Sequence, residues 1–265
     1  MPQQQWTAVD TEQVQCCLCH VWGEVKYRVD PFAVVQCPTC ALVFISPRLK
    51  PDALQRFYDE PGYFEGGGVY GSGRLNPAMA LQRIWTRGRL AAIAKVKPAP
   101  ASLLEVGSGY GYFLEAAKGA GYRVSGVELS VAGVEQSGRR GLGVFNGQLA
   151  DAPDGRTADV ICFWDTLEHV PDPLAFLTEV RRRLAADGAF ALSVPYFSSL
   201  PSRMLGRRWW TLKPEQHIWH YTPATLRTLA ARAGLVVTDV ITSPAKPANL
   251  TRLDSLVALG RALPA

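Results

Sequence analysis

Carboxylate and imidazole groups lie close together in the stretch Asp165-Thr166-Leu167-Glu168-His169. The pKa of an ordinary imidazole lies near neutrality, so His169 could act as a general base that removes a proton from a hydroxyl group or an acidic carbon. Asp165, Glu168 and His169 could instead hold a divalent ion such as Mg2+ that orients a substrate oxygen. In a third interpretation, Glu168 and His169 only cap and brace their loop. The sequence leaves all three open.

A second candidate base, His217, lies in a long segment without a regular pattern, residues 195–221. This segment is rich in aromatic and arginine side chains, on which sugar rings and nucleotide bases stack. We therefore expect it to line a substrate pocket. Packing of the segment where it enters the next helix is an equally simple role for His217.

Four cysteines have the spacing of a zinc site. Cys16 and Cys19 form one C-x2-C pair, and Cys37 and Cys40 form another after 17 intervening residues. Four thiolates at this spacing suit tetrahedral Zn2+, and because protein atoms fill all four positions the predicted role is structural. Cys17 is a spare that could replace Cys16. The segment is too small to hold itself by its own core, so metal binding would supply its folding energy.

A glycine-rich turn follows a short apolar run. Gly107, Gly109 and Gly111 form G-x-G-x-G, in which the third glycine comes one position earlier than in the dinucleotide pattern G-x-G-x-x-G. Glu105 precedes the turn and could face a cationic group. Glu128 ends the next predicted strand, where a carboxylate can accept hydrogen bonds from both ribose hydroxyls. A ligand with a ribose, an ammonium group and no phosphate fits this set better than a dinucleotide, and S-adenosylmethionine (SAM) is such a ligand.

The elements that must position these groups alternate along the chain. We expect strands at 102–106, 122–128, 143–146, 158–164, 189–194 and 235–241, and helices at 77–96, 111–119, 131–140, 173–185 and 223–233. Such alternation predicts an α/β fold with a parallel sheet and helices on both faces. Ligands bind at the carboxyl ends of the strands. Gly107, Glu128 and the stretch after Phe163 should therefore share one edge.

From about Arg89 to Val240 the chain resembles the class I SAM-dependent methyltransferases. The residues that carry the resemblance are Leu-Glu-Val-Gly-Ser-Gly-Tyr-Gly at 104–111, Gly-Val-Glu-Leu-Ser at 126–130, Phe-Trp-Asp-Thr-Leu-Glu-His-Val at 163–170 and Asp-Gly-Ala-Phe at 187–190. The resemblance implies a Rossmann-like sheet, to which the cysteines would add a small N-terminal zinc-binding β domain.

The resemblance also implies where the cofactor lies. Glu105, Gly107 and Gly109 would surround the methionine part, Glu128 would hold the ribose, and Leu129 and Leu149 would enclose the adenine. The cofactor-binding set is completed by four neighbours of these residues: Ser108, Gly111, Ser130 and Asp165.

Two narrower resemblances concern the acceptor. Asp165 to His169 is similar to the acidic-x-x-Glu-His of quinone-biosynthesis O-methyltransferases, for which a magnesium site is implied. Glu215 to Thr222 is similar to the Glu-His segment of deoxysugar C-methyltransferases, which also carry an N-terminal zinc-binding domain. In that family the histidine acts as a base beside the sugar; His217 matches it, although Gln216 replaces the preceding glutamate.

These patterns favour methyl transfer to the oxygen or carbon of a small molecule, with a sugar or sugar nucleotide as the leading substrate. Three alternatives stay open. They are a quinone-type O-methyltransferase, an RNA methyltransferase that grips nucleic acid with its cysteine segment, and a scaffold protein without catalysis. The acceptor atom and the oligomeric state are not determined by the sequence.

Composition argues against a nucleic-acid or membrane partner. The net charge of the 265-residue chain is only +5, and dense basic spots occur only at 181–183 and 207–208. The first ten residues hold no apolar run, and no stretch approaches the roughly 18–20 apolar residues of a membrane span. We therefore expect a cytoplasmic protein, in which cysteines serve as metal ligands rather than in disulfides.

The predicted organisation has four parts: a zinc-ribbon-like domain at 1–48, a helical and flap region at 49–100, the SAM-binding domain at 101–242 with its substrate insertion at 195–221, and a tail at 243–265. Within the second part, Tyr58 to Gly73 should form a flap over the cofactor, with Tyr63 and Tyr70 as contacts. The tail should form a loop and then a helix from Leu250 to Leu263. The final strand of the sheet would then be absent or replaced.

Overall fold

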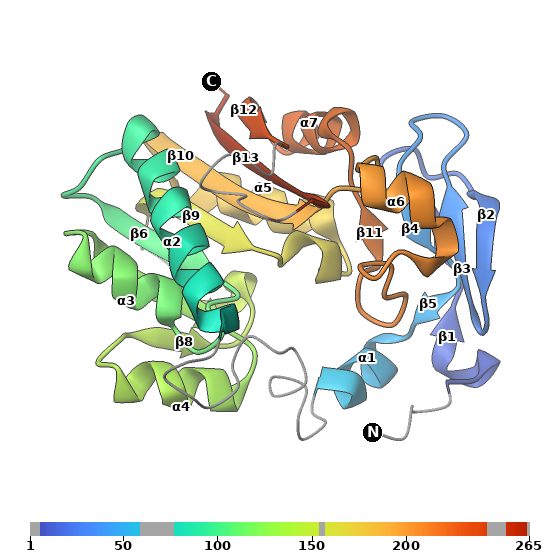
Figure 1. The fold of residues 1–265 in the computed structure, drawn as a ribbon, viewed down its shortest axis with the longest axis horizontal. Coiled ribbons are helices and arrows are strands. Elements are labelled where there is room, and N and C mark those ends of the chain that lie inside the picture. Colours follow the sequence, from blue (N-terminus) through green and yellow to red (C-terminus); the bar gives the residue numbers. More distant parts are fainter. Residues whose placement is uncertain (1–5, 59–76, 154–156, 243–252, 264–265) are drawn as a thin grey trace.

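The computed structural model of the chain describes residues 6–58, 77–153, 157–242 and 253–263. Its main body is a seven-stranded sheet with the order β12-β13-β10-β9-β6-β7-β8 (Figure 1). All strands run parallel except β13, which is antiparallel to both of its neighbours. The bounds are β6 (Ser102–Val106), β7 (Arg123–Glu128), β8 (Val144–Asn146), β9 (Ala158–Trp164), β10 (Leu184–Pro195), β12 (Leu235–Ile241) and β13 (Ser255–Ala262). The expected Rossmann-like α/β fold is confirmed.

Helices cover both faces of this sheet because successive strand residues point to opposite sides. Leu103 and Val160 pack in a core with α2 (Pro77–Val96) and α3 (Tyr112–Gly119). Their neighbours Leu104 and Ile161 pack in a second core with α5 (Pro173–Arg183) and α7 (Pro223–Arg232). A further helix, α4 (Val131–Arg139), lies beside β7 and β8. Within the described part of the chain, no helix has both the length and the apolar character that crossing a bilayer demands.

The N-terminal region forms a second sheet, with the order β11-β4-β3-β2. Its strands are β2 (Glu24–Val29), β3 (Phe32–Gln36), β4 (Val43–Ile45) and β11 (Trp219–His220). The antiparallel pair β2–β3 forms a hairpin between the two cysteine pairs. A separate pair joins β1 (Thr11–Glu12) to β5 (Arg48–Leu49), and α1 (Pro51–Tyr58) follows. Because β11 comes from the segment 195–221, the N-terminal sheet is completed by a strand far along the chain (Figure 1).

The tail corrects one prediction. A helix from Leu250 to Leu263 was expected, but residues 255–262 form β13, so the final strand of the sheet is present. Its first six residues are all buried, because β13 lies between β10 and β12. A strand buried on both faces lacks alternation and cannot be told from a helix by its apolar run. A Cβ on Gly260 would lie 2.2 Å from the Val236 carbonyl oxygen, which explains the glycine at this position.

The predicted flap falls mostly outside the described residues, and Tyr63 and Tyr70 lie there. Its first residue, Tyr58, ends α1. The segment 195–221 contains one further helix, α6 (Leu200–Leu205), and then a series of turns that lead to β11.

Candidate active site

The glycine turn lies at the carboxyl end of β6. Gly107, Gly109 and Gly111 have φ angles of 74°, 52° and 77°, in the left-handed region that favours glycine. A Cβ on Gly107 would lie 2.6 Å from the Thr166 hydroxyl oxygen, and a Cβ on Gly111 would lie 2.7 Å from that of Ser137. The first glycine therefore allows close approach of the chain after β9, and the third allows close packing of α4.

The carboxylate of Glu128 joins the turn to the start of α4. Its oxygens accept hydrogen bonds from the backbone N–H groups of Gly109, at 2.7 Å, and Ser130, at 2.9 Å. Ser130 caps α4, and its hydroxyl accepts from Gly133 N–H at 3.3 Å. Burial raises the pKa of Glu128, although these backbone N–H groups oppose the shift. Each carboxylate oxygen has a second lone pair that can accept from a ligand hydroxyl.

Two polar atoms beside the turn are buried without a hydrogen-bond partner among the residues that the structure describes. They are Oε2 of Glu105 and the hydroxyl of Ser108. Burial raises the pKa of Glu105 well above its usual range; the nearby Arg89 cation opposes this shift and the Glu128 carboxylate adds to it. A buried acceptor of this kind is costly until a donor meets it. A ligand with an ammonium group fits this requirement.

The two leucines predicted to enclose an adenine lie in different surroundings. Leu129, directly after β7, is 63% exposed. Leu149 begins a 3-10 turn, is 3% exposed and belongs to the core on the α5 and α7 face. Leu129 therefore offers open apolar surface next to Glu128, whereas the Leu149 side chain is part of the core.

Asp165 follows β9 with a φ of 52°, which is unusual for a residue other than glycine. Its carboxylate accepts from the Ser193 hydroxyl at 3.0 Å and pairs with Arg89 of α2 at 3.4 Å. The Arg89 guanidinium also lies 4.6 Å from the centre of the Trp164 ring. Sequence reasoning did not single out Arg89. Its position in an amphipathic helix carried no signal for a buried cation at the carboxyl end of a distant strand.

The structure brings the two candidate bases together. His169 belongs to the 3-10 turn Leu167–His169 and His217 to the segment 195–221, yet their ring centres lie 4.8 Å apart. Burial lowers the pKa of both imidazoles, to about 4 for His217. The backbone N–H of Ile218 donates to the Glu168 carbonyl at 2.9 Å, which ties the two segments together.

Donor atoms of Glu168, His169 and His217 lie within 4.8 Å of one another. The divalent-ion site proposed from the sequence combined Asp165, Glu168 and His169. In the structure Asp165 lies outside the group of three, and His217 takes its place.

Asp254, just before β13, fixes the segment that carries His217. Its carboxylate accepts from the Trp209 indole N–H at 2.9 Å and from the Thr211 hydroxyl at 2.5 Å. The Thr211 carbonyl in turn lies 2.7 Å from Nδ1 of His217. Sequence reasoning missed Asp254, because the tail around it was predicted to be helical.

The four predicted zinc ligands also converge, since the sulfur atoms of Cys16, Cys19, Cys37 and Cys40 lie within 4.8 Å of one another. The two pairs have the same backbone geometry. The fourth residue after the first cysteine of each pair donates to the carbonyl of that cysteine, from His20 to Cys16 and from Ala41 to Cys37. This donor set, two equivalent turns with four thiols, fits tetrahedral Zn2+.

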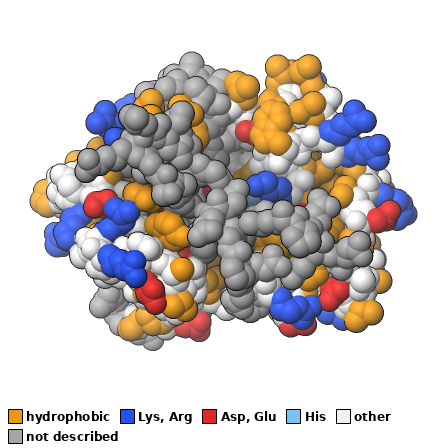
Figure 2. All heavy atoms as spheres, turned by 60° about the horizontal axis from the view of Figure 1, so that its bottom comes forward, with side chains coloured by type: hydrophobic (Ala, Val, Ile, Leu, Met, Phe, Trp, Pro, Cys, Tyr) orange, Lys and Arg blue, Asp and Glu red, His pale blue; other side chains and the backbone are white. Residues whose placement is uncertain are grey.

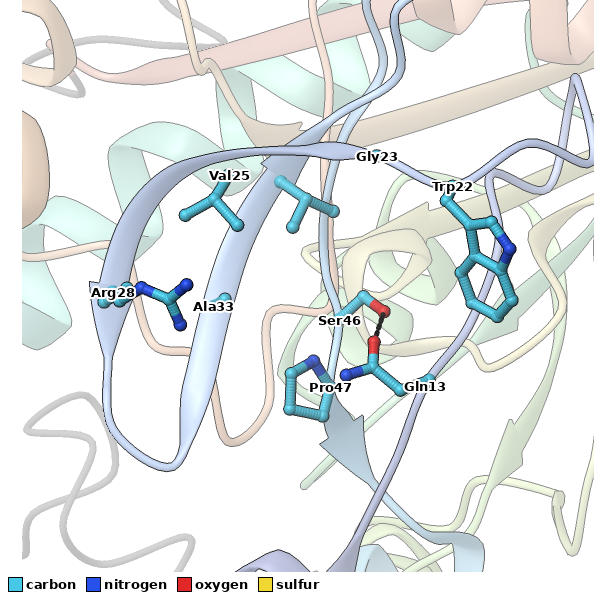
Figure 3. A pocket seen from close by; sticks show the side chains of 9 residues that line it. Gln13, Trp22, Gly23, Val25, Arg28, Ala33, Ser46 and Pro47 are labelled. Carbon is cyan, nitrogen blue, oxygen red and sulfur yellow. Dashed lines mark hydrogen bonds between the residues drawn. The ribbon is translucent and has the colours of Figure 1, made fainter.

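Two pockets lie away from the strand ends. One, of about 380 Å3, lies against the N-terminal sheet, with Trp22, Val25 and Arg28 among its lining residues (Figure 3). The other, of about 480 Å3, is where β2 meets the segment 195–221; it is lined by Lys26, Tyr27, Phe197, Ser198, Ser202 and Arg203. Figure 2 shows basic and acidic side chains interspersed over one face of the molecule, without a continuous basic surface on the part that is coloured.

Comparison with known proteins agrees with this geometry. Residues 79–240 match the family model described as a methyltransferase domain, which covers more than half of the chain. The match includes the glycine turn, the stretch after β9 and the segment that carries His217. No curated protein matches the chain.

Solved structures share the fold at low sequence identity. A 1,6-didemethyltoxoflavin N1-methyltransferase from Burkholderia thailandensis, solved with its substrate and S-adenosylhomocysteine, has a TM-score of 0.61 and 19% identity over 91% of this chain and 100% of that one. A magnesium protoporphyrin IX methyltransferase from Synechocystis, solved with S-adenosylhomocysteine, has a TM-score of 0.60 and 15% identity; the match covers 80% of this chain and 100% of that one. A SAM-dependent methyltransferase from Clostridium acetobutylicum has a TM-score of 0.56 and 12% identity; the match covers 80% of this chain and 99% of that one.

Proposed function

This chain belongs to the methyltransferase-domain family, and from that premise we propose that it transfers the methyl group of SAM to a small-molecule acceptor, a sugar or sugar nucleotide. The observation that carries the proposal is convergence at one sheet edge. The glycine turn, Glu128 and the His169–His217 pair come from separate segments, and all lie at or beside the carboxyl ends of β6, β7 and β9.

In this proposal the cofactor lies along the glycine turn. The buried carboxylate of Glu105 and the hydroxyl of Ser108 meet the polar methionine part, which lies against the backbone of the turn from Gly107 to Gly109. The ribose hydroxyls donate to the free lone pairs of Glu128. The exposed side chain of Leu129 covers the adenine. Asp165 faces the methyl-transfer region, where Arg89 and Ser193 hold it in place.

The acceptor is activated at the His169–His217 pair. Methyl transfer is a substitution in which the acceptor atom, the methyl carbon and the sulfur must be in line, so alignment and exclusion of water contribute more than acid–base catalysis. Nδ1 of His217 meets a carbonyl, which can only accept, so this nitrogen carries the proton and Nε2 presents a lone pair to the acceptor.

The second pocket supports the substrate class. It combines two cationic side chains, two aromatic rings and two serine hydroxyl groups, a mixture that suits a sugar and an attached phosphate. Phe197 lines this pocket and also packs against the buried residue His220, because the centres of the two rings lie 5.5 Å apart. Of the aromatic residues of the segment, Trp209 is buried, whereas Trp210 is 55% exposed and available for stacking.

The cysteine group holds a structural Zn2+ in this proposal. All four coordination positions are thiolates, so none is open to a reactant. Although burial raises the pKa of Cys37, backbone N–H groups of Cys40 and Thr39 bring it down to about 7. Burial raises the pKa of Cys16, Cys19 and Cys40, so Zn2+ would have to displace the protons of these three thiols.

A calorimetric titration with SAM, followed by a mass-spectrometric screen of nucleotide sugars for a methyl adduct, tests the proposal. Gly109→Val should abolish SAM binding, because the branched side chain is strained at a φ of 52° and fills the space for the ligand. Gly138→Ala is the matched control, since a Cβ at Gly138 meets nothing within 4 Å. Unchanged SAM binding by Gly109→Val would refute the assignment of the cofactor site, and methylation confined to RNA would refute the substrate class.

A further inference from the structure

The side chains of Glu168, His169 and His217 offer three ligand atoms within 4.8 Å of one another. Glu168 is fully buried, His217 is 7% exposed and His169 is partly exposed. We infer that these three residues form a second metal site that binds a divalent transition-metal ion beside the methyl-transfer region. The site deepens the proposed function, because the ion would act on the acceptor of that same reaction.

Both imidazoles are held as metal-binding histidines usually are. One ring nitrogen of such a histidine donates to a carbonyl or carboxylate, and the other faces the metal. Nδ1 of His217 lies 2.7 Å from the Thr211 carbonyl oxygen, which leaves the lone pair of Nε2 available. His169 makes a hydrogen bond with the backbone of Gln216.

The donor atoms define the class of ion. Two imidazole nitrogens and one carboxylate suit Zn2+, Fe2+, Co2+ or Ni2+, whereas Mg2+ prefers oxygen ligands in octahedral geometry. Three protein ligands leave positions open for water or substrate, as in catalytic metal sites. Asp165, which would have favoured Mg2+, pairs with Arg89 and Ser193 instead.

The position of the site gives the ion a role. Glu168 and His169 lie close after Thr166, whose hydroxyl donates to the Val106 carbonyl at 3.3 Å, directly before the glycine turn. In the metal-bound form Nε2 of His217 would be a ligand of the ion instead of the base described above. An acceptor hydroxyl on the ion would lose its proton to solvent water more readily than a free one. Its oxygen then forms a bond to the methyl carbon while the carbon–sulfur bond breaks, and both electrons of the broken bond stay on the sulfur.

Equilibrium dialysis of the full chain against buffered Zn2+, with bound zinc measured by mass spectrometry, tests the inference without any substrate. The wild-type chain should bind two ions, one at the four cysteines and one at this site. The variants Glu168→Gln and His217→Gln should each bind only one ion tightly, the ion at the four cysteines. The affinity of each variant for the second ion should fall by at least about 10- to 100-fold, which is the effect of losing a residue that only supports a metal ligand. Circular dichroism establishes that each variant is folded.

Matched substitutions serve as controls. Glu105→Gln alters another buried glutamate and His220→Gln another buried histidine, and neither belongs to the group of three. Both variants should still bind two ions, and Glu105→Gln should instead lower the affinity for SAM. The inference is overturned if the wild-type chain saturates at one ion, or if Glu168→Gln and His217→Gln still bind two. SAM titration of the same proteins reports separately on the proposed function.

Discussion

Glu105 illustrates how a single residue couples burial to ligand choice. Its carboxylate lies at the end of β6 with one oxygen unpartnered among the described residues, and burial raises its pKa well above the usual range. An ionised carboxylate in that position would be costly without a cation. In the proposed cofactor site the ligand ammonium would supply one, so SAM binding and ionisation of Glu105 should be linked.

We predict that the SAM affinity rises with pH through the raised pKa of Glu105. Below that pKa the carboxyl group is protonated and binds the ammonium weakly; above it the carboxylate attracts the cation. Glu105→Gln should weaken binding by about 1.5–3 kcal/mol and flatten this dependence. Calorimetry over a pH series measures both effects. The other charged or titratable groups that face Glu105 are Arg89, Glu128 and Cys162. Because arginine stays protonated, an unchanged pH slope in Glu105→Gln would assign the titration to Glu128 or Cys162.

At the scale of elements, local patterns predicted the fold well. The helix at 77–96 and the strands at 158–164 and 235–241 were expected with the bounds that the structure has. In these segments the hydrophobic period and the flanking proline or glycine act on neighbouring residues, so the sequence carries the signal locally. The strand expected at 189–194 extends in the structure from Leu184 to Pro195, because Leu184 also pairs with Ala158 of β9.

What the sequence could not predict depends on contacts between distant residues. The glycine turn, Glu128 and Asp165 to His169 could be singled out as candidates because each is a compact motif. The contact of His169 with His217 spans two separate segments, and so do the Arg89 and Asp254 networks. The helix predicted for the tail failed for the same reason, since residues 255–262 become a strand through pairing with β10 and β12.

The link between the tail and the segment 195–221 leads to a prediction. Asp254→Ala removes the half-buried carboxylate oxygen, Oδ2, that accepts both the Trp209 and the Thr211 hydrogen bond. We expect the free energy of unfolding to fall by about 1–3 kcal/mol and methyl transfer to fall with it, while SAM affinity stays unchanged. Denaturant unfolding, calorimetry and a transfer assay measure the three quantities.

Asp239→Ala, an exposed position on β12, is the control for this substitution and should change none of the three. A loss of SAM affinity in Asp254→Ala equal to the loss of transfer would contradict the prediction. The tail would then support the whole sheet edge rather than the acceptor side alone.

At the scale of the whole molecule, the cysteine region and the methyltransferase sheet form one folded unit. The core on the α5 and α7 face includes Leu18 and Phe44 of the N-terminal region together with Ile161 and Leu226 of the main sheet. Strand β11 extends the N-terminal sheet, and the Arg232 guanidinium of α7 donates to the Leu18 carbonyl. The residues that close the N-terminal sheet come two positions after His217, so the cysteine region helps to position His217.

Removing zinc from the cysteines should therefore destabilise the whole chain. Structural zinc contributes about 10–16 kcal/mol of binding free energy in small domains, comparable with the total stability of a typical protein. We expect Cys37→Ser to lower the melting temperature in a single transition and to reduce methyl transfer, because β11 loses its partner strand β4 and His217 loses its support. Cys17→Ser, outside the group of four, should keep both zinc and stability. Scanning calorimetry measures this. The contrary outcome would be two separate transitions, of which the upper one has the melting temperature of the wild-type chain. Two transitions would mean that the cysteine region folds independently and that β11 pairs with it without transmitting stability.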